Sequence, residues 1–285
     1  MGQAKIMGNT ETVDGSALGK QTDYVSVYTP SLLFPIARQE SRSKLGIESE
    51  LPFQGVDIWT SYELSWLNPK GKPIVAIAEF IFPINSVSII ESKSFKLYLN
   101  SFNQTVFKDF MDVTRTLEAD LSGAVSASVM VSIQSLAQAA GQGVGHFTGE
   151  NIDGLDVEFS VYDVDASLLC LANPDHIVTE SLCSNLLKSN CPVTGQPDWA
   201  SLYIEYRGAE ISKEALLKYI VSFRQHQGFH ESCVEQIFID IQKYCQPESL
   251  TVYARYTRRG GLDINPCRSS LNASFTADSV RLVRQ

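Results

Sequence analysis

A cysteine and an aspartate stand seven positions apart on a segment of this chain that should bend. Cys191 and Asp198 flank a run that contains Pro192, Gly195 and Pro197. A thiolate can add to an electron-poor carbon, and a carboxyl group held nearby can protonate the atom that then gains negative charge. A packed thiol beside a turn-capping aspartate gives the same pattern without chemistry. The segment is therefore a candidate nucleophile and proton donor, with a structural interpretation beside it.

Histidines and a further cysteine follow some thirty residues later. His226, His230 and Cys233 have a spacing that suits metal ligands on one helix face, but Gly228 interrupts that helix, so we predict no metal site. His230 and Glu231 then begin a new helix. Their ordinary interpretation is a surface histidine and an acid that stabilises the first helical turn.

Two other short runs mix charges with flexible or polar positions. Glu91, Ser92 and Lys93 directly follow a predicted strand, which by itself is typical of a solvated helix start. Arg258 and Arg259 stand next to two glycines, which is typical of a turn at the end of a strand. Two arginines beside flexible backbone also suit a phosphate site.

The elements that must position these residues follow from hydrophobic periodicity. The pattern predicts strands over 74–82, 155–164 and 250–256, and it shows helical spacing over 102–117, 212–225 and 230–244. In the second half the order is a strand pair, a helix pair and a strand pair. This order predicts an α+β fold with both helices on one face of an antiparallel sheet.

The two halves of the chain resemble each other. Motifs between residues 69 and 104 recur in the same order between residues 192 and 225, at an offset of about 120 residues. In this alignment Asn68 occupies the position of Cys191, so only the second copy has the thiol. Five glycines between 141 and 154 indicate the boundary. We therefore expect an N-terminal arm over 1–22, a first module over 23–145 and a second over 146–285.

Composition excludes some classes of function. The formal net charge is −9, so the surface should repel a phosphate backbone, and direct binding of nucleic acid is disfavoured. The six cysteines include no C-x-x-C pair, so we expect reduced thiols. We find no leader and no apolar run long enough for a membrane span, and we expect a cytoplasmic protein.

Four motifs together resemble one family, the NADPH-dependent 7-cyano-7-deazaguanine reductases, which are the nitrile reductases of queuosine biosynthesis. The resemblance is to the long, two-module type and extends from about Tyr24 to the C-terminus. The motifs, in the order of the chain, are Glu91-Ser-Lys-Ser-Phe-Lys-Leu-Tyr98, Cys191-Pro-Val-Thr-Gly-Gln-Pro-Asp198, Phe229-His-Glu231 and Tyr253-Ala-Arg-Tyr-Thr-Arg-Arg-Gly-Gly261.

The resemblance implies the tunnelling fold, in which antiparallel sheets backed by two helices assemble side by side, and a homodimer or larger closed oligomer. It implies that Cys191 forms a covalent thioimide with the nitrile, that Asp198 donates a proton and that His230 assists. Residues implied to bind the substrate are Ile90, Glu91, Ser92, His230 and Glu231. Residues implied to contact NADPH are Ser92, Lys93, Arg259 and Gly260.

Two NADPH are implied because a nitrile becomes a primary amine only by gaining two hydrides. The expected substrate is a free small molecule, without direct contact to tRNA. Two alternatives stay open from the sequence. One is another tunnelling-fold purine or pterin enzyme, such as a cyclohydrolase that uses zinc; the other is a purine-binding module without catalysis.

Overall fold

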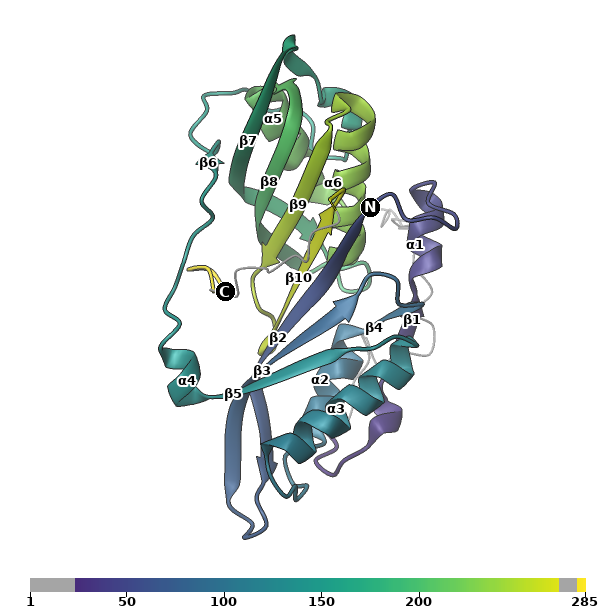
Figure 1. Ribbon diagram of the computed structural model, residues 1–285, viewed down its shortest axis with the longest axis vertical. Helices are drawn as coiled ribbons and strands as arrows, with labels where there is room; N and C mark the ends of the chain where they lie inside the picture. Colours follow the sequence, from purple (N-terminus) through teal and green to yellow (C-terminus); the bar gives the residue numbers. More distant parts are fainter. Residues whose placement is uncertain (1–23, 272–280) are drawn as a thin grey trace, which may run out of the picture.

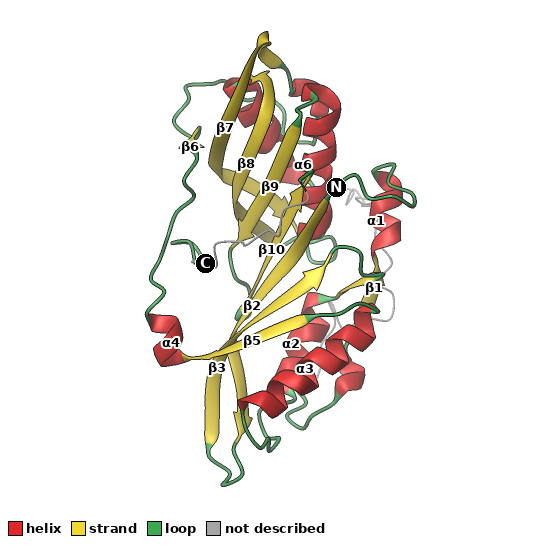
Figure 2. Ribbon diagram, viewed as in Figure 1, coloured by secondary structure: helices red, strands yellow, loops and turns green. Residues whose placement is uncertain are grey.

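The computed structural model describes residues 24–271 and 281–285 (Figure 1). The predicted N-terminal arm over residues 1–22 lies outside the described residues. Within the described part, one long sheet curves through the molecule, and the larger helices lie on one side of it (Figure 2).

Eight strands of the described chain form this sheet, in the order β5-β3-β2-β10-β9-β8-β7-β6. All neighbouring pairs are antiparallel except β6 with β7. A separate antiparallel pair joins β1 to β4. The strands are β1 (Pro35–Ala37), β2 (Gln54–Leu67), β3 (Pro73–Pro83), β4 (Ser88–Ile90), β5 (Met130–Ser135), β6 (Glu150–Asn151), β7 (Leu171–Asn190), β8 (Pro197–Ile211), β9 (Ser249–Tyr256) and β10 (Leu262–Ser269).

Each half of the sheet is backed by two helices. α2 and α3 cover β2, β3 and β5, and α5 and α6 cover the strands from β7 to β10 (Figure 2). The helices are α1 (Arg38–Lys44), α2 (Ser92–Asn100), α3 (Phe110–Val125), α4 (Leu136–Ala140), α5 (Lys213–Ser222) and α6 (His230–Cys245), with short 3-10 turns η1 (Pro30–Leu32), η2 (Ala166–Leu168) and η3 (Phe223–Gln225). The expected α+β architecture, with an antiparallel sheet backed by two helices in each half, is confirmed.

The core forms because alternate strand residues are apolar and face the helices. On β3, Ala76, Ala78 and Phe80 are each at most 1% exposed. Phe80 meets Phe95 of α2 edge to face, with ring centroids 5.0 Å apart. Glu79 of the same strand lies on the opposite face of the sheet, away from the helices.

Most of the predicted elements are confirmed. The strands over 74–82 and 250–256 correspond to β3 and β9, and the helical segments over 212–225 and 230–244 correspond to α5 with η3 and to α6. The predicted order of strand pair, helix pair and strand pair is found in β7-β8-α5-α6-β9-β10. The first half has the strand pair β2-β3 and the helix pair α2-α3, followed by one strand of the sheet, β5. β10 of the second half pairs with β2.

Two segment predictions were wrong. The helical spacing over 102–117 spans a turn and then α3, which begins only after Asp109 caps it by accepting a bond from the Asp112 amide. Phe102 and Phe107 stack with ring centroids 5.0 Å apart, so these apolar residues are buried without belonging to a helix. The segment 155–164 packs its apolar residues on the core without forming a strand, and β7 starts at Leu171.

A buried network of ion pairs joins the two halves. Arg268 of β10 is fully buried and contacts Asp57 of β2 at 2.8 Å and Glu235 of α6 at 2.9 Å. Arg38 and Arg42 of α1 hold the same two carboxylates at 2.6 and 2.8 Å. Although burial acts to raise them, the arginines, Arg268 foremost, hold the pKa values of both carboxyls below their ordinary values.

Among the described residues, no helix has the length and apolar character needed to cross a lipid bilayer.

Replacing Arg268 with Met should lower the free energy of unfolding by about 3–5 kcal/mol, because it leaves two buried carboxylates without their shared partner. Chemical denaturation measures this change. Arg207→Met is the matched control, since Arg207 and Glu248 form an exposed pair and its loss should change stability by less than about 1 kcal/mol. Equal losses in the two variants would contradict this account of the network.

Candidate active site

The hairpin between β7 and β8 holds the thiol. Cys191 directly follows β7, and its amide donates to the Gln196 carbonyl at 2.9 Å while the Gly195 amide donates back to the Cys191 carbonyl at 3.0 Å. Gly195 has a φ of +67°, a left-handed conformation that glycine adopts without strain. The loop therefore fixes the cysteine backbone, and the side chain lies in a pocket at 5% exposure.

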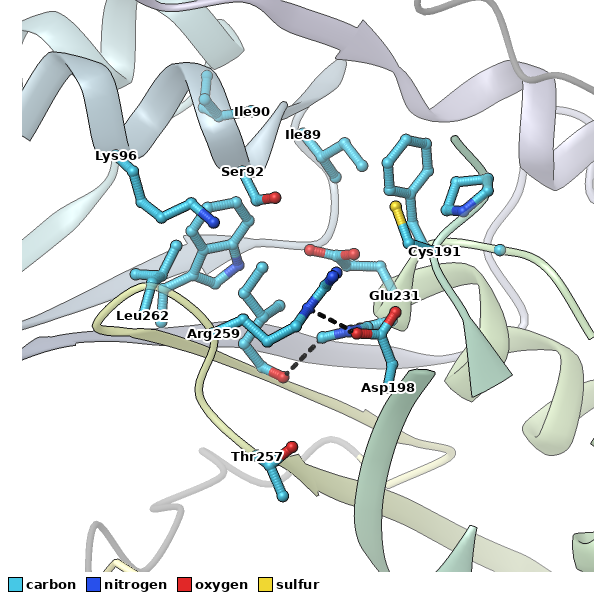
Figure 3. A pocket seen from close by; sticks show the side chains of 16 residues that line it. Ile89, Ile90, Ser92, Lys96, Cys191, Asp198, Glu231, Thr257, Arg259 and Leu262 are labelled. Atoms are coloured by element: carbon cyan, nitrogen blue, oxygen red, sulfur yellow. Dashed lines mark hydrogen bonds and ion pairs between the residues drawn. The ribbon is translucent and has the colours of Figure 1, made fainter. Parts of the chain in front are cut away.

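The same hairpin is bonded to the start of α6. The Asn190 amide donates to the His226 carbonyl at 2.8 Å, and the Gly228 amide donates to the Asn190 carbonyl at 3.2 Å. This bridge brings Cys191 next to the first turn of α6, which begins at His230. Residues separated by about forty positions in the chain thus line one pocket (Figure 3).

His230 is held on both of its ring edges and on one face. Its ring stacks on Tyr256 with centroids 3.7 Å apart, its Nδ1 lies 3.4 Å from the Ile264 carbonyl, and its Nε2 lies 3.5 Å from Asp198 Oδ1. The Ile264 carbonyl can only accept a hydrogen bond, so it favours the tautomer with the proton on Nδ1 and leaves Nε2 to exchange a proton with Asp198. His230 is therefore positioned for proton transfer.

Asp198 lies on β8, is 3% exposed and also pairs with an arginine. Arg259 Nε is 2.9 Å from Asp198 Oδ1, and Arg259 Nη1 donates to Gln196 at 2.8 Å (Figure 3). The tight turn between β9 and β10 brings Arg259 there, with Gly260 and Gly261 both at positive φ. Cys191, Asp198, His230 and Arg259 thus line one pocket.

Glu231 is a buried carboxyl with one oxygen facing no partner. Its Oε1 has no hydrogen bond among the described protein atoms, and the residue is 4% exposed. Burial, with a contribution from the charge of Asp57, raises the pKa of Glu231 to about 7. An unpaired buried acceptor that lines a pocket is suited to receive N–H bonds from a ligand.

The first half of the chain closes the other side of the pocket. Ile90 at the end of β4 and Ser92 at the start of α2 both line it. Glu91 between them does not line it, because its carboxylate accepts bonds from the Lys93 and Ser94 amides at 2.7 and 2.8 Å and caps α2. In this structure Glu91 caps the N-terminus of α2 and does not face the space that a substrate would occupy.

Sequence reasoning missed several lining residues, above all Lys96. Burial lowers the pKa of Lys96, and Arg259 acts in the same direction, whereas Glu91, Cys191 and Asp198 act against it. The signal was available, since Lys96 stands one helical turn after Ser92 in the quoted motif. Trp59 on β2 also lines the pocket, and nothing in the local sequence distinguishes it from a core residue.

A wider cleft of about 740 Å³ adjoins this pocket, and Lys96 and Leu262 line both. Lys93 and Gly260 lie there, apart from Cys191, together with amide side chains of α2 and the following turn. A Cβ on Gly260 would come within 3.2 Å of Lys96 Cδ, so the glycine keeps this passage open. Two ammonium groups, amides and bare backbone suit an anionic dinucleotide.

Two of the remaining cysteines are poor candidates for a nucleophile. Burial raises the pKa of Cys245 to about 11 and that of Cys267 well above its ordinary value, which disfavours their thiolates. Neither lines the pocket. Within residues 24–271 and 281–285, no three His, Cys, Asp or Glu side chains are arranged to hold a metal ion.

Comparison with known proteins gives two family matches and one similar solved structure. The N-terminal model of the nitrile reductase, 7-cyano-7-deazaguanine-reductase family matches residues 24–133, and the model of the QueF-like protein family matches residues 197–274. A crystal structure of the archaeosine synthase QueF-Like in the apo form is similar at 20% identity, with a TM-score of 0.30, and covers 34% of this chain and 96% of that one.

The buried carboxyl of Glu231 should make stability depend on pH. Because its pKa is raised to about 7, its contribution to stability is full at acidic pH and is lost as the pH rises towards 7. Between pH 5 and 8 the free energy of unfolding should fall by about 2 kcal/mol more in the wild type than in Glu231→Gln. Denaturant titrations across this pH range measure the free energy of unfolding of each variant. Glu214→Gln, in the exposed first turn of α5, is the control and should follow the wild-type profile. Parallel profiles for the wild type and Glu231→Gln would disprove this assignment.

Proposed function

We propose that this chain, which belongs to the nitrile reductase family in its two-module form, reduces 7-cyano-7-deazaguanine to the primary amine 7-aminomethyl-7-deazaguanine with two NADPH. The observation that carries the proposal is a buried thiol that shares one pocket with a carboxyl, a histidine and an unpaired carboxyl oxygen. The first three serve bond formation and proton transfer, and the fourth suits a guanine edge.

The first step forms a carbon–sulfur bond. The Cys191 thiolate adds to the nitrile carbon, and the nitrile nitrogen receives a proton from Asp198, which gives a neutral thioimide. The ion pair with Arg259 and the contact with His230 Nε2 keep the Asp198 carboxyl fixed and hydrogen-bonded between proton transfers. Asp198 is the direct donor in this proposal, and His230 resupplies its proton.

Bound NADPH supplies a hydride to the thioimide carbon and a second molecule supplies one to the imine. Between these events the nitrogen lone pair expels the Cys191 sulfur, which restores the thiolate and leaves an imine. Nitrogen gains one proton when the thioimide forms and one with the second hydride, so two hydrides and two protons in all convert the nitrile to the amine. The apolar side chains of Ile90 and Trp59 limit access of water to the imine.

The substrate is recognised from both halves of the chain. Glu231 accepts N–H bonds from the guanine-like edge through the oxygen that lacks a protein partner. Ile90 and Ser92 contact the opposite side of the ring, and Glu91 acts through the helix end that it caps. The adjoining cleft holds the cofactor with Lys93 and Gly260, and Ser92 and Arg259 contact it from the thiol pocket.

We propose that the partner of this chain is a small molecule and not a nucleic acid. The net charge of −9 suits an enzyme that acts on the free base and does not bind bare tRNA. We expect a homodimer or larger closed oligomer and a cytoplasmic location.

Mixing the protein with 7-cyano-7-deazaguanine alone should add the mass of one substrate to Cys191. Intact-protein mass spectrometry measures the adduct, and peptide mapping locates it. Cys191→Ala should give no adduct and lose more than about 10³-fold of the rate, since the covalent route is removed. Cys233→Ala is the matched control, a nearby buried cysteine with no part in the proposed chemistry. An unmodified wild type that also fails to oxidise NADPH would refute the proposed function.

Lys93→Met should raise the KM for NADPH by about tenfold or more and leave the Cys191 adduct unchanged, because the residue lies in the adjoining cleft and not beside the thiol. Steady-state oxidation of NADPH, at two equivalents per amine formed, measures it. Lys70→Met, on the exposed hairpin between β2 and β3, is the control. An unchanged KM in Lys93→Met would argue against this cofactor cleft.

A further inference from the structure

A second cavity, of about 510 Å³, lies over the sheet where β2, β3 and β9 meet the segment around α4. Three arginines line it, and they come from separate places in the chain: Arg255 from β9, Arg258 from the turn after it, and Arg281 from the C-terminal segment. None of them has a role in the proposed reaction.

The alternation of the strands shows which face the cavity occupies. On β3, Phe80 packs in the core under the helices, so its neighbour Glu79 points to the other face. On β9, Tyr256 packs in the core and its neighbour Arg255 points to that same other face. The sheet therefore separates this cavity from the pocket of Cys191, and its occupant cannot be the molecule that reacts with the thiol.

The arginines are held in place. Arg255 is 5% exposed, the guanidinium of Arg258 lies 3.8 Å from the centroid of the Tyr62 ring, and Arg281 donates to the Gln285 carbonyl at 3.2 Å. Stacking on an aromatic ring leaves the in-plane N–H groups of a guanidinium available to a ligand. Little side-chain entropy would then be lost when an anion binds.

The charge in this cavity is opposite to that of the whole chain. Of the described residues that line the cavity, Glu79 carries a carboxyl and three carry a guanidinium group. Asp263 lies near Arg255 without lining the cavity, and it already accepts hydrogen bonds from Tyr62 at 2.7 Å and Asn265 at 2.6 Å. Burial raises the pKa of both carboxyls, which makes them weaker counterions. A chain with a net charge of −9 thus has a local excess of positive charge in a hollow.

We propose that this cavity binds a phosphate-bearing small molecule, with its phosphate oxygens on the guanidinium groups of Arg255, Arg258 and Arg281. Guanidinium forks bind phosphate through paired N–H bonds, and a hollow of this size takes a phosphate with an organic body attached. Gln134 and Gln142 line the same cavity and offer amides to that body.

The site goes beyond the proposed reaction, yet one turn joins the two. Arg258 and Arg259 are neighbours, and the first lines the cavity whereas the second pairs with Asp198 in the thiol pocket. An occupant of the cavity fixes the turn on which Arg259 stands.

Isothermal titration calorimetry with inorganic pyrophosphate tests the site, with sodium chloride at matched ionic strength as the reference titration. We expect saturable binding at one site per chain in this cavity, with affinity reduced at least tenfold in Arg258→Gln and in Arg281→Gln. Arg284→Gln is the matched control, because Arg284 lies outside the cavity, over Trp199, and donates to the Asn185 carbonyl. It should bind as the wild type does.

Three results would overturn the proposal. The first is that the wild type gives no heat beyond the chloride reference. The second is that both Arg258→Gln and Arg281→Gln still bind pyrophosphate as the wild type does. The third is that only Lys93→Met abolishes binding, which would assign the anion to the cofactor cleft. Thermal melting checks that each variant folds, and Arg281→Gln decides alone if Arg258→Gln does not. Formation of the Cys191 adduct is measured in the same samples: a wild type without the adduct but with pyrophosphate binding would refute the reductase and leave this site standing.

Discussion

Arg268 is the residue on which the joining of the two halves depends. Its guanidinium is fully buried and shared between a strand of the first half and a helix of the second. Without it, Asp57 would keep only Arg38 and Glu235 only Arg42, and two buried charges would be left under-compensated in the core. The network is costly to desolvate, and its value lies in fixing one arrangement. Because Arg268 of β10 must lie beside Asp57 of β2, these two strands pair in a single register.

The active site depends on that register because it is composite. The thiol, the proton-transfer groups and Glu231 come from the second half, and Ile90, Ser92 and Lys96 come from the first. Glu231 lies one helical turn before Glu235 on α6, so the network that joins the halves also fixes the helix from which the unpaired carboxyl projects. In the proposed function, stability and substrate recognition therefore depend on the same few buried charges.

Local patterns predicted the fold well where one face of an element is apolar and the other is not, as in β3 and α6. They failed where apolar residues are buried outside a helix or strand, as in the stacked pair Phe102 and Phe107. The site residues were identified through a resemblance of motifs, and the structure brings most of them into one pocket. The contribution of Trp59 could not be predicted, because it depends on contacts between distant segments. The cap formed by Glu91 is local, but glutamate is not among the residues that usually cap a helix start.

The turn from Thr257 to Gly261 has a consequence for how this chain can vary. Successive side chains in it face opposite sides of the sheet, with Thr257 and Arg259 towards the thiol pocket and Arg258 towards the far cavity. Surface turns usually tolerate insertions and deletions, but here a change of one residue would exchange the two arginines between sides. The number of residues in this turn should therefore be as constrained as their identity.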